Sequence, residues 1–179
     1  MDKASVVRKD ESRKTWASQR ASLMQNVEVL DRLETLVREI GGMHNKLVLL
    51  VGASRSGKTK LLSELASRFH IEPLNVGLEL GRRLAATPKN KRGFSAGELL
   101  REIAGKRDAE VPLLLDNMEV LFEKSLHINP LELVKLMAHS QRLVGVWPGE
   151  LRSDRLIYAD MGHPEHRDYG RDNVVVLEI

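Results

Sequence analysis

Residues 52–59 read GASRSGKT, a stretch in which two glycines, a lysine and a threonine stand at fixed spacing. The spacing from Gly52 through Gly57 and Lys58 to Thr59 is that of a phosphate-binding loop between a strand and a helix. Glycines let the backbone curl so that successive N–H groups point at one anion, and the start of the helix adds its own unpaired N–H groups. The pattern therefore predicts a loop that holds the phosphates of a nucleotide.

The sequence on both sides of this loop supports the prediction. Residues 46–52, KLVLLVG, are a short apolar run that is typical of a strand buried on both faces, and residues 58–69, KTKLLSELASRF, have helical periodicity. We expect Lys58 to reach the β and γ phosphates of ATP and the Thr59 hydroxyl to ligate Mg²⁺. The expected nucleotide-binding residues are Gly52, Ala53, Ser54, Arg55, Ser56, Gly57, Lys58, Thr59 and Lys60.

Residues 111–122, VPLLLDNMEVLF, contain a second apolar strand, which ends in an acid. Because a parallel strand delivers its last residue beside the phosphate site, we expect Asp116 to hold Mg²⁺ together with Thr59. ATPases that polarise the attacking water usually carry a glutamate after this aspartate, but this chain has Asn117. An amide orients a water and cannot take its proton, so hydrolysis is expected to be slow, or Glu119 serves as the base. The alternative role of Glu119 is that of an acid favoured by a helix dipole.

Strands that alternate with helices predict an α/β fold with a largely parallel sheet covered on both faces. We divide the chain into a basic, mobile tail (residues 1–21), an N-terminal amphipathic helix (22–45, ended by Gly41 and Gly42) and a P-loop NTPase core (46–179). In the core we expect a second strand from Leu74, a helix opened by a capping box at Ser95–Glu98, and strands over residues 142–147, 156–160 and 173–179.

Two arginines, Arg152 and Arg155, fall in the turn expected between two of these strands. In ring-forming ATPases of the extended AAA type, an arginine from this segment reaches the nucleotide of a neighbouring subunit and stabilises charge on the transferred phosphoryl group. Both arginines are therefore candidate catalytic residues that act in trans, and the alternative is two surface arginines without a role. Trp147 and Pro148 replace the usual polar sensor. The last strand ends almost at residue 179, so we expect an AAA-like core without a C-terminal helical lid, its nucleotide covered by the N-terminal helix, another subunit or a partner.

Composition narrows the class of protein. The 179 residues are 42% hydrophobic and 30% charged, contain no cysteine, and have no apolar run of the ~20 residues needed to cross a bilayer. We therefore expect one globular domain with a cytoplasmic location and no membrane partner. The net charge is +3, but the window 82–107 holds eight basic and two acidic residues and so carries +6. This basic window fits DNA or an acidic partner, and the alternative is a solvated loop.

Five stretches together resemble the BrxF family, the small P-loop proteins of type 3 BREX bacteriophage-defence systems. They are GASRSGKTKLL, LLLDNMEVLF, INPLELVKLMA, LVGVWPGEL and LIYADMGHPEHRDY, within residues 46–169, and the later ones make the match specific. The resemblance implies a cytoplasmic bacterial protein that works beside a DNA methyltransferase and other BREX proteins to distinguish unmodified phage DNA. It implies that Gly52, Gly57, Lys58 and Thr59 bind nucleotide and that Asp116 holds magnesium. It assigns no base, so Glu119 stays a prediction from geometry.

Two classes of function remain open. The first is an ATPase whose nucleotide state controls self-assembly into a homo-oligomer, or its grip on DNA or on other BREX proteins. The second is a nucleotide-dependent scaffold or DNA-binding module with little turnover, which Asn117 and the missing polar sensor favour. A third class, a small-molecule kinase, is less favoured because the sequence has no recognisable pattern for an acceptor pocket.

Overall fold

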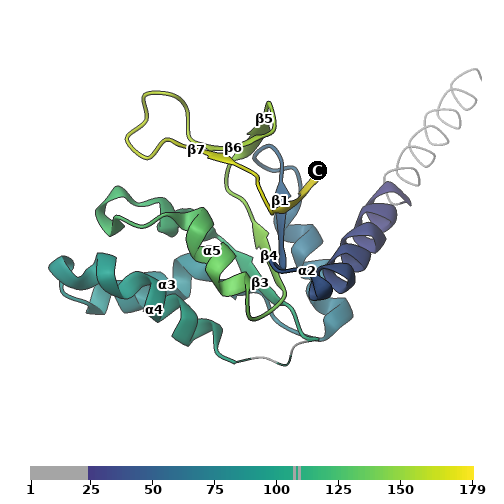
Figure 1. Ribbon diagram of the computed structural model, residues 1–179, viewed down its shortest axis with the longest axis horizontal. Helices are drawn as coiled ribbons and strands as arrows, with labels where there is room; N and C mark the ends of the chain where they lie inside the picture. Colours follow the sequence, from purple (N-terminus) through teal and green to yellow (C-terminus); the bar gives the residue numbers. More distant parts are fainter. Residues whose placement is uncertain (1–23, 107, 109) are drawn as a thin grey trace, which may run out of the picture.

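The structure is a computed structural model that describes residues 24–106, 108 and 110–179. The expected basic tail and Arg107 of the basic window lie outside these residues. In the described part, a five-stranded parallel sheet is flanked by helices, and a second sheet of three antiparallel strands lies beside it (Figure 1). The prediction of an α/β fold with a largely parallel sheet is confirmed. No helix in the described ranges is both long enough and apolar enough to cross a bilayer.

The parallel sheet has the strand order β2-β3-β4-β1-β8, with β1 between β4 and β8. Strands β1, β3 and β4 are buried along their whole length, as their continuous apolar runs predicted. The strands are β1 (Leu47–Val51), β2 (Leu74–Asn75), β3 (Leu113–Asp116), β4 (Leu143–Val146) and β8 (Val175–Glu178).

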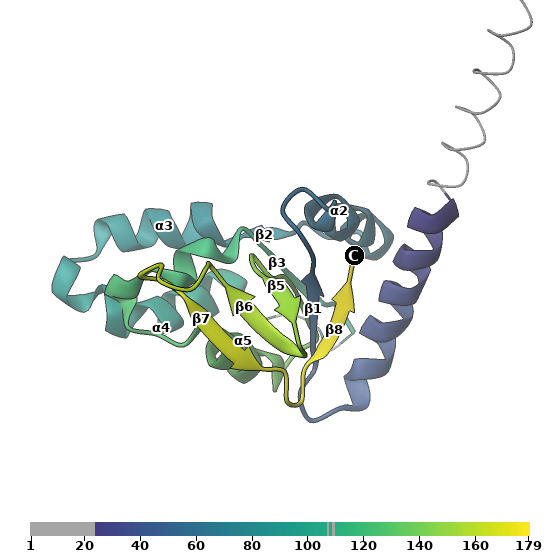
Figure 2. The same cartoon turned by 90° about the horizontal axis from the view of Figure 1, so that it is seen from above.

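Helices cover the two faces of this sheet because successive strand residues point to opposite sides. Val48 and Leu50 of β1 pack in one cluster with the N-terminal helix and α2, whereas Leu47, Leu49 and Val51 pack in another with α3, α4 and α5. Figure 2 shows the N-terminal helix alongside β8. The helices are the N-terminal helix (residues 24–39), α2 (Lys58–Phe69), α3 (Val76–Ala86), α4 (Arg92–Ala104) and α5 (Pro130–Ala138). The 3₁₀ turns are η1 (Ile40–Gly42), η2 (Lys89–Lys91), η3 (Met118–Phe122) and η4 (Lys124–Leu126).

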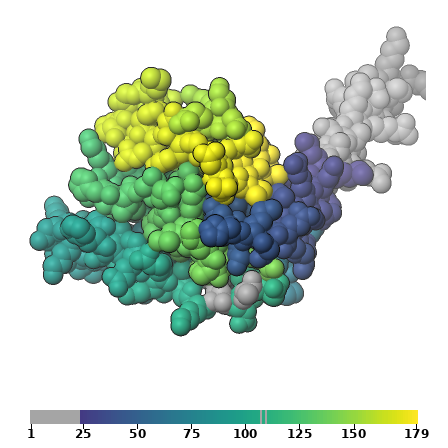
Figure 3. Space-filling model, viewed as in Figure 1, coloured from purple at the N-terminus to yellow at the C-terminus, as the bar shows by residue number. Residues whose placement is uncertain are grey.

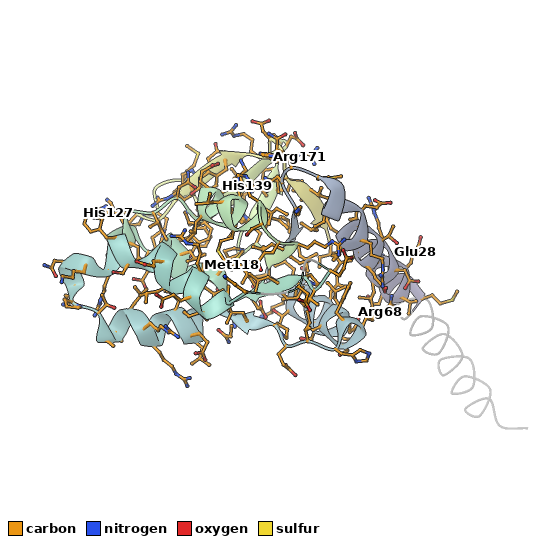
Figure 4. The ribbon with its side chains drawn as sticks, turned by 60° about the horizontal axis from the view of Figure 1, so that its bottom comes forward. Glu28, Arg68, Met118, His127, His139 and Arg171 are labelled. Atoms are coloured by element: carbon orange, nitrogen blue, oxygen red, sulfur yellow. The ribbon has the colours of Figure 1, made fainter. Side chains whose placement is uncertain are left out.

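The N-terminal helix is packed on the domain through the apolar stripe that the sequence predicted. Leu30, Leu33, Val37 and Ile40 are buried, while Val27, one turn before Leu30, is exposed. An ion-pair cluster adds to this packing: Arg68 of α2 contacts Asp31 and Glu34 at 2.7 and 2.6 Å. Figure 4 shows Arg68 on the side of the molecule where the helix with Glu28 lies.

The small sheet has the order β5-β6-β7 and follows β4 directly in the chain. Its strands are β5 (Glu150–Arg152), β6 (Arg155–Tyr158) and β7 (Arg167–Gly170). The fully buried Trp147 anchors it: the indole packs edge-on against Phe122 and Tyr169, and its N–H donates to the Ile157 carbonyl at 3.4 Å. In the space-filling view the small sheet forms the yellow-green surface at one end of the molecule (Figure 3).

Residues 150–160 differ from the prediction. We expected a turn and then a strand of the main sheet over 156–160, but the turn contains β5, and β6 belongs to the antiparallel sheet. The fifth strand of the parallel sheet is β8, which pairs with β1. Residues 150–170 instead pair with one another in antiparallel register, and Leu156 is the one residue of β6 that is buried, as in a sheet packed on the core by one face.

The region after α2 also differs. The second strand ends at Asn75, because the Asn75 side chain accepts the Leu78 N–H at 3.0 Å and so caps α3. The predicted capping box at Ser95 is wrong: α4 begins at Arg92, so Ser95 lies inside its first turn.

Candidate functional site

The glycine loop, residues 52–57, connects β1 to α2 and is strongly curved. Gly57 has φ +99° and Arg55 has φ +65°, and the Ser56 N–H donates to the Ala53 carbonyl at 3.2 Å. The first hydrogen bond that continues into α2 joins the Leu61 N–H to the Gly57 carbonyl, so the N–H groups of residues 58–60 have no partner within the helix. A cavity of about 430 Å³ is lined by residues 55–60. The loop therefore forms a concave site with backbone donors, which suits an anion.

Lys58 lies at the mouth of this site. Its ammonium group donates to the Gly52 carbonyl and, at 2.9 Å, to the Ala53 carbonyl. Burial lowers the pKa of Lys58, while the negative charges of Glu119 and Glu150 act to raise it. An ammonium group has three donors, so one donor remains for an incoming anion while both carbonyl bonds persist.

Thr59 and Asp116 meet at the same end of the sheet, although 57 positions separate them in the chain. The Thr59 hydroxyl Oγ1 donates to Asp116 Oδ1 at 3.2 Å, and the Asn117 N–H donates to the same carboxylate oxygen at 2.9 Å. Asp116 is only 8% exposed. Mg²⁺ prefers oxygen ligands and usually takes one or two from the protein, with waters and phosphate oxygens filling the rest. The hydroxyl and carboxylate fit that role.

Asn117 and Glu119 follow directly. Asn117 has φ +53°, a left-handed conformation that turns the chain sharply out of β3 into η3. Glu119 is exposed in η3, and its charge acts on both Lys58 and Tyr158. Glu119, the candidate base, therefore lies in the neighbourhood of Lys58 and the glycine loop.

The two candidate arginines occupy different environments. Arg152 lines a cavity of about 220 Å³ together with Gly52 and Ser54 of its own glycine loop, whereas Arg155 is not among the residues that line it. Arg155 instead pairs with Asp168 of β7. The expectation that both arginines reach a neighbouring subunit stays a prediction.

Sequence reasoning missed several residues near the loop. Glu150 of β5 is close enough to act on Lys58, and its only sequence signal is its place two residues before Arg152. A third cavity, of about 450 Å³, lies between the N-terminal helix, the glycine loop, α2 and β8. Gln25 and Asn26 line it from the helix, and Lys60 lines it from α2. No motif marks these two amides.

Three arginines of the basic window are engaged by groups of this chain. Arg82 and Arg83 pair with Glu79 and Glu102, and Arg92 donates to the Thr87 carbonyl. Among the described residues, Lys89 and Lys91 have no ion pair, and Phe94 beside them is 93% exposed. Phe94 is an exposed aromatic residue among basic residues, a pattern typical of nucleic-acid binding that the sequence analysis missed.

These observations define a class of protein: an α/β protein with a parallel sheet, a glycine loop before a helix, and a buried aspartate that contacts the start of that helix. Comparison of the chain with protein-family models, curated proteins and solved structures finds no match.

Proposed function

We propose that this chain is an ATP-binding P-loop nucleoside triphosphatase with an AAA-like core, acting in bacterial BREX defence against phage. The observation that supports the nucleotide site best is the 3.2 Å contact between Thr59 and Asp116 at the mouth of the glycine loop. A loop that kept its glycines for shape alone would have no reason to meet a buried carboxylate there. The role in phage defence rests on the resemblance of residues 46–169 to the BrxF family.

The residues around the loop suit the hydrolysis of ATP. The loop N–H groups and Lys58 bind the phosphates, and Thr59 with Asp116 would hold Mg²⁺, which neutralises charge on the β and γ phosphates. The oxygen of a water bonds to the γ phosphorus while the bond from that phosphorus to the β–γ bridging oxygen breaks, and ADP leaves with the electron pair. Glu119 takes the proton of the water in this scheme. Asn117 offers no base, so we expect slow turnover by the isolated protein.

The N-terminal helix is the proposed cover for the rest of the nucleotide. The 450 Å³ cavity that it forms with the loop is large enough for a base and a ribose. The amides of Gln25 and Asn26 supply both hydrogen-bond donors and acceptors to a base edge.

Nucleotide binding is tested with the Mg²⁺ complex of a non-hydrolysable ATP analogue, by calorimetry. Lys58→Ala is expected to abolish binding, and Asp116→Asn is expected to weaken binding with Mg²⁺ far more than binding without it. Lys135→Ala, which removes a lysine from α5, is the matched control and should bind as the parent does. Failure of the parent protein to bind ATP and GTP alike would refute the proposed function.

The nucleotide state is proposed to control assembly or partner engagement. Light scattering with and without Mg²⁺ and the analogue measures this directly. Growth from monomer to multimer would support assembly of one homo-oligomer, and a monomer under both conditions would shift the role to a module read by other BREX proteins.

A second candidate function is nucleic-acid binding with little hydrolysis, and Phe94 favours it. An exposed aromatic ring beside Lys89 and Lys91 suits a base stacked over a phosphate backbone. We expect Phe94→Ala to weaken binding of single-stranded DNA about tenfold in fluorescence anisotropy, because stacking contributes ~1–3 kcal/mol per base. Leu136→Ala removes another exposed apolar side chain, away from the window, and is the control. Equal affinities of parent and Phe94→Ala would remove this candidate.

A further inference from the structure

We propose that Arg152 contacts the terminal phosphate of the nucleotide bound to its own chain, and that Glu150 positions it until the phosphate arrives. This inference rests on the proposed nucleotide function and changes one part of it: the arginine acts in cis, so no second subunit is required. It concerns the 220 Å³ cavity between the glycine loop and the small sheet.

The walls of that cavity carry the first argument. Gly52 and Ser54 of the loop form one side, and residues 148–150, Arg152, Ile157, Ala159 and Asp160 form the other. Glu150 lies directly opposite Ile157 in the β5–β6 ladder, and the side chains of residues two apart on a strand share one face. Arg152 therefore shares with Glu150 the face of β5 that looks onto the loop.

Lys58 marks where the terminal phosphate belongs. Its ammonium group bonds to the carbonyl of Gly52, the residue that also lines the cavity of Arg152. Glu150 lies close enough to Lys58 for its charge to act on the ammonium group. The same carboxylate holds the Arg152 guanidinium, with Nε and Nη2 at 2.9 and 2.8 Å. The same acid thus pairs with one of the two cations that a phosphate would bridge and acts on the other through its charge.

The ion pair between Arg152 and Glu150 is weak enough for another anion to replace Glu150. Both side chains are about half exposed, and Arg152 Nη2 also lies 3.9 Å from Asp160 Oδ1. Ion pairs in such exposed positions contribute little to stability. A phosphate brings more negative charge and more acceptor oxygens than one carboxylate, and a guanidinium binds it with two parallel hydrogen bonds. The arriving γ phosphate therefore displaces Glu150 from Arg152 and gains a partner that ADP cannot engage.

The experiment compares affinities for a non-hydrolysable ATP analogue and for ADP, both with Mg²⁺, at a protein concentration where light scattering gives a monomer. Arg152→Ala should lower the preference for the triphosphate about tenfold or more, since charge-assisted bonds to the γ phosphate are lost. Glu150→Gln should raise affinity for the triphosphate about threefold, because a like charge near the phosphates is removed. Arg171→Ala, which breaks the ion pair with Asp154 outside the cavity, is the control and should match the parent.

Mixing of two variants separates cis from trans. The Lys58→Ala protein and the Arg152→Ala protein are purified separately and mixed. ATP hydrolysis by the mixture is then compared with hydrolysis by each variant alone. No gain on mixing is expected, because neither chain has both groups. Recovery of activity, or an unchanged triphosphate preference in Arg152→Ala, would overturn the inference. If the parent binds no nucleotide at all, the proposed function itself fails, which is a different result.

Discussion

Asn117 suits the left-handed backbone conformation at its position, but its amide cannot act as a base in ATP hydrolysis. Its φ of +53° falls in the left-handed region, which asparagine tolerates better than most residues. The turn that it makes leads directly from Asp116 into η3, where Glu119 lies. An asparagine at this position therefore has a structural reason that does not depend on hydrolysis.

Replacement of Asn117 by glutamate tests this reason. We expect Asn117→Glu to lower the free energy of unfolding by about 1 kcal/mol, since a longer L side chain pays more in the left-handed region. Urea denaturation measures the change. Asn117→Gly, which is free of this cost, should remain within about 0.5 kcal/mol of the parent. A glutamate variant as stable as the parent would show that the turn does not select the residue.

The glycine loop was the part of the site that residues alone could predict. Its spacing fixed Lys58 and Thr59, and the apolar strand ending in an acid predicted that Asp116 would meet Thr59, as it does. Glu150, Gln25 and Asn26 were not predictable in this way, because they come from segments whose position depends on how the small sheet and the N-terminal helix pack. Motifs report local spacing, and these residues reach the site only through tertiary contacts.

At the scale of elements, the N-terminal helix depends on the sheet that it covers. Leu33 is fully buried among side chains of the helix, α2 and the strands. An isolated helix of this length is marginal in water, so the packed face supplies most of its stability. The helix also forms one wall of the proposed base cavity.

Leu33→Ala should therefore lower the free energy of unfolding by ~2–5 kcal/mol, the usual cost of a cavity in a packed core. Arg32→Ala changes an exposed neighbour on the same helix and should alter it by less than about 0.5 kcal/mol. Thermal denaturation followed by circular dichroism distinguishes the two. Similar losses for both variants would mean that the helix is not held by its apolar face.

Helices and strands were predicted best where the apolar residues form a continuous run. They were predicted least well where a capping hydrogen bond sets the end of an element. The buried runs of β1, β3 and β4 were recognised, because each is an apolar stretch too short for a helix. The end of β2 at Asn75 was not predicted, since it depends on one hydrogen bond, in which the Leu78 N–H donates to the Asn75 side-chain oxygen and so caps α3. The small sheet was missed for a related reason: three short strands need one another before any of them is defined.

At the scale of the whole molecule, the small sheet is joined to the core by aromatic packing. Trp147 lies between Phe122 and Tyr169, and Tyr158 stacks on Phe122 with ring centroids 3.9 Å apart. Burial raises the pKa of Tyr158 and of Tyr169 above the ordinary 10.0, and nearby Glu165 and Glu119 raise that of Tyr158 further. The packing that attaches the sheet thus favours the protonated form of both phenols.

This packing predicts a pH dependence. Above pH 10 the unfolded chain loses the phenol protons first and the folded chain retains them, so the free energy of unfolding should fall as pH rises above about 10. Below pH 10 these groups contribute no slope. Urea denaturation at pH 9 and pH 11 measures the effect, and Tyr158→Phe should reduce it. An equal loss of stability in the parent and in Tyr158→Phe would assign the alkaline transition to other groups.

The pairing of β1 with β8 has a consequence for how the chain acquires its function. The Asn45 side chain donates to the Asn173 carbonyl across 128 positions of sequence, and closing so long a segment of chain costs conformational entropy. Gly52 is packed so closely on the Ile179 carbonyl that a Cβ there would overlap it. Glu178 and Ile179, at the end of the chain that follows this pairing, also line the 450 Å³ cavity beside the loop. We therefore expect nucleotide binding to require β8 paired with β1, so that a molecule in which β8 has come away from the sheet does not bind ATP.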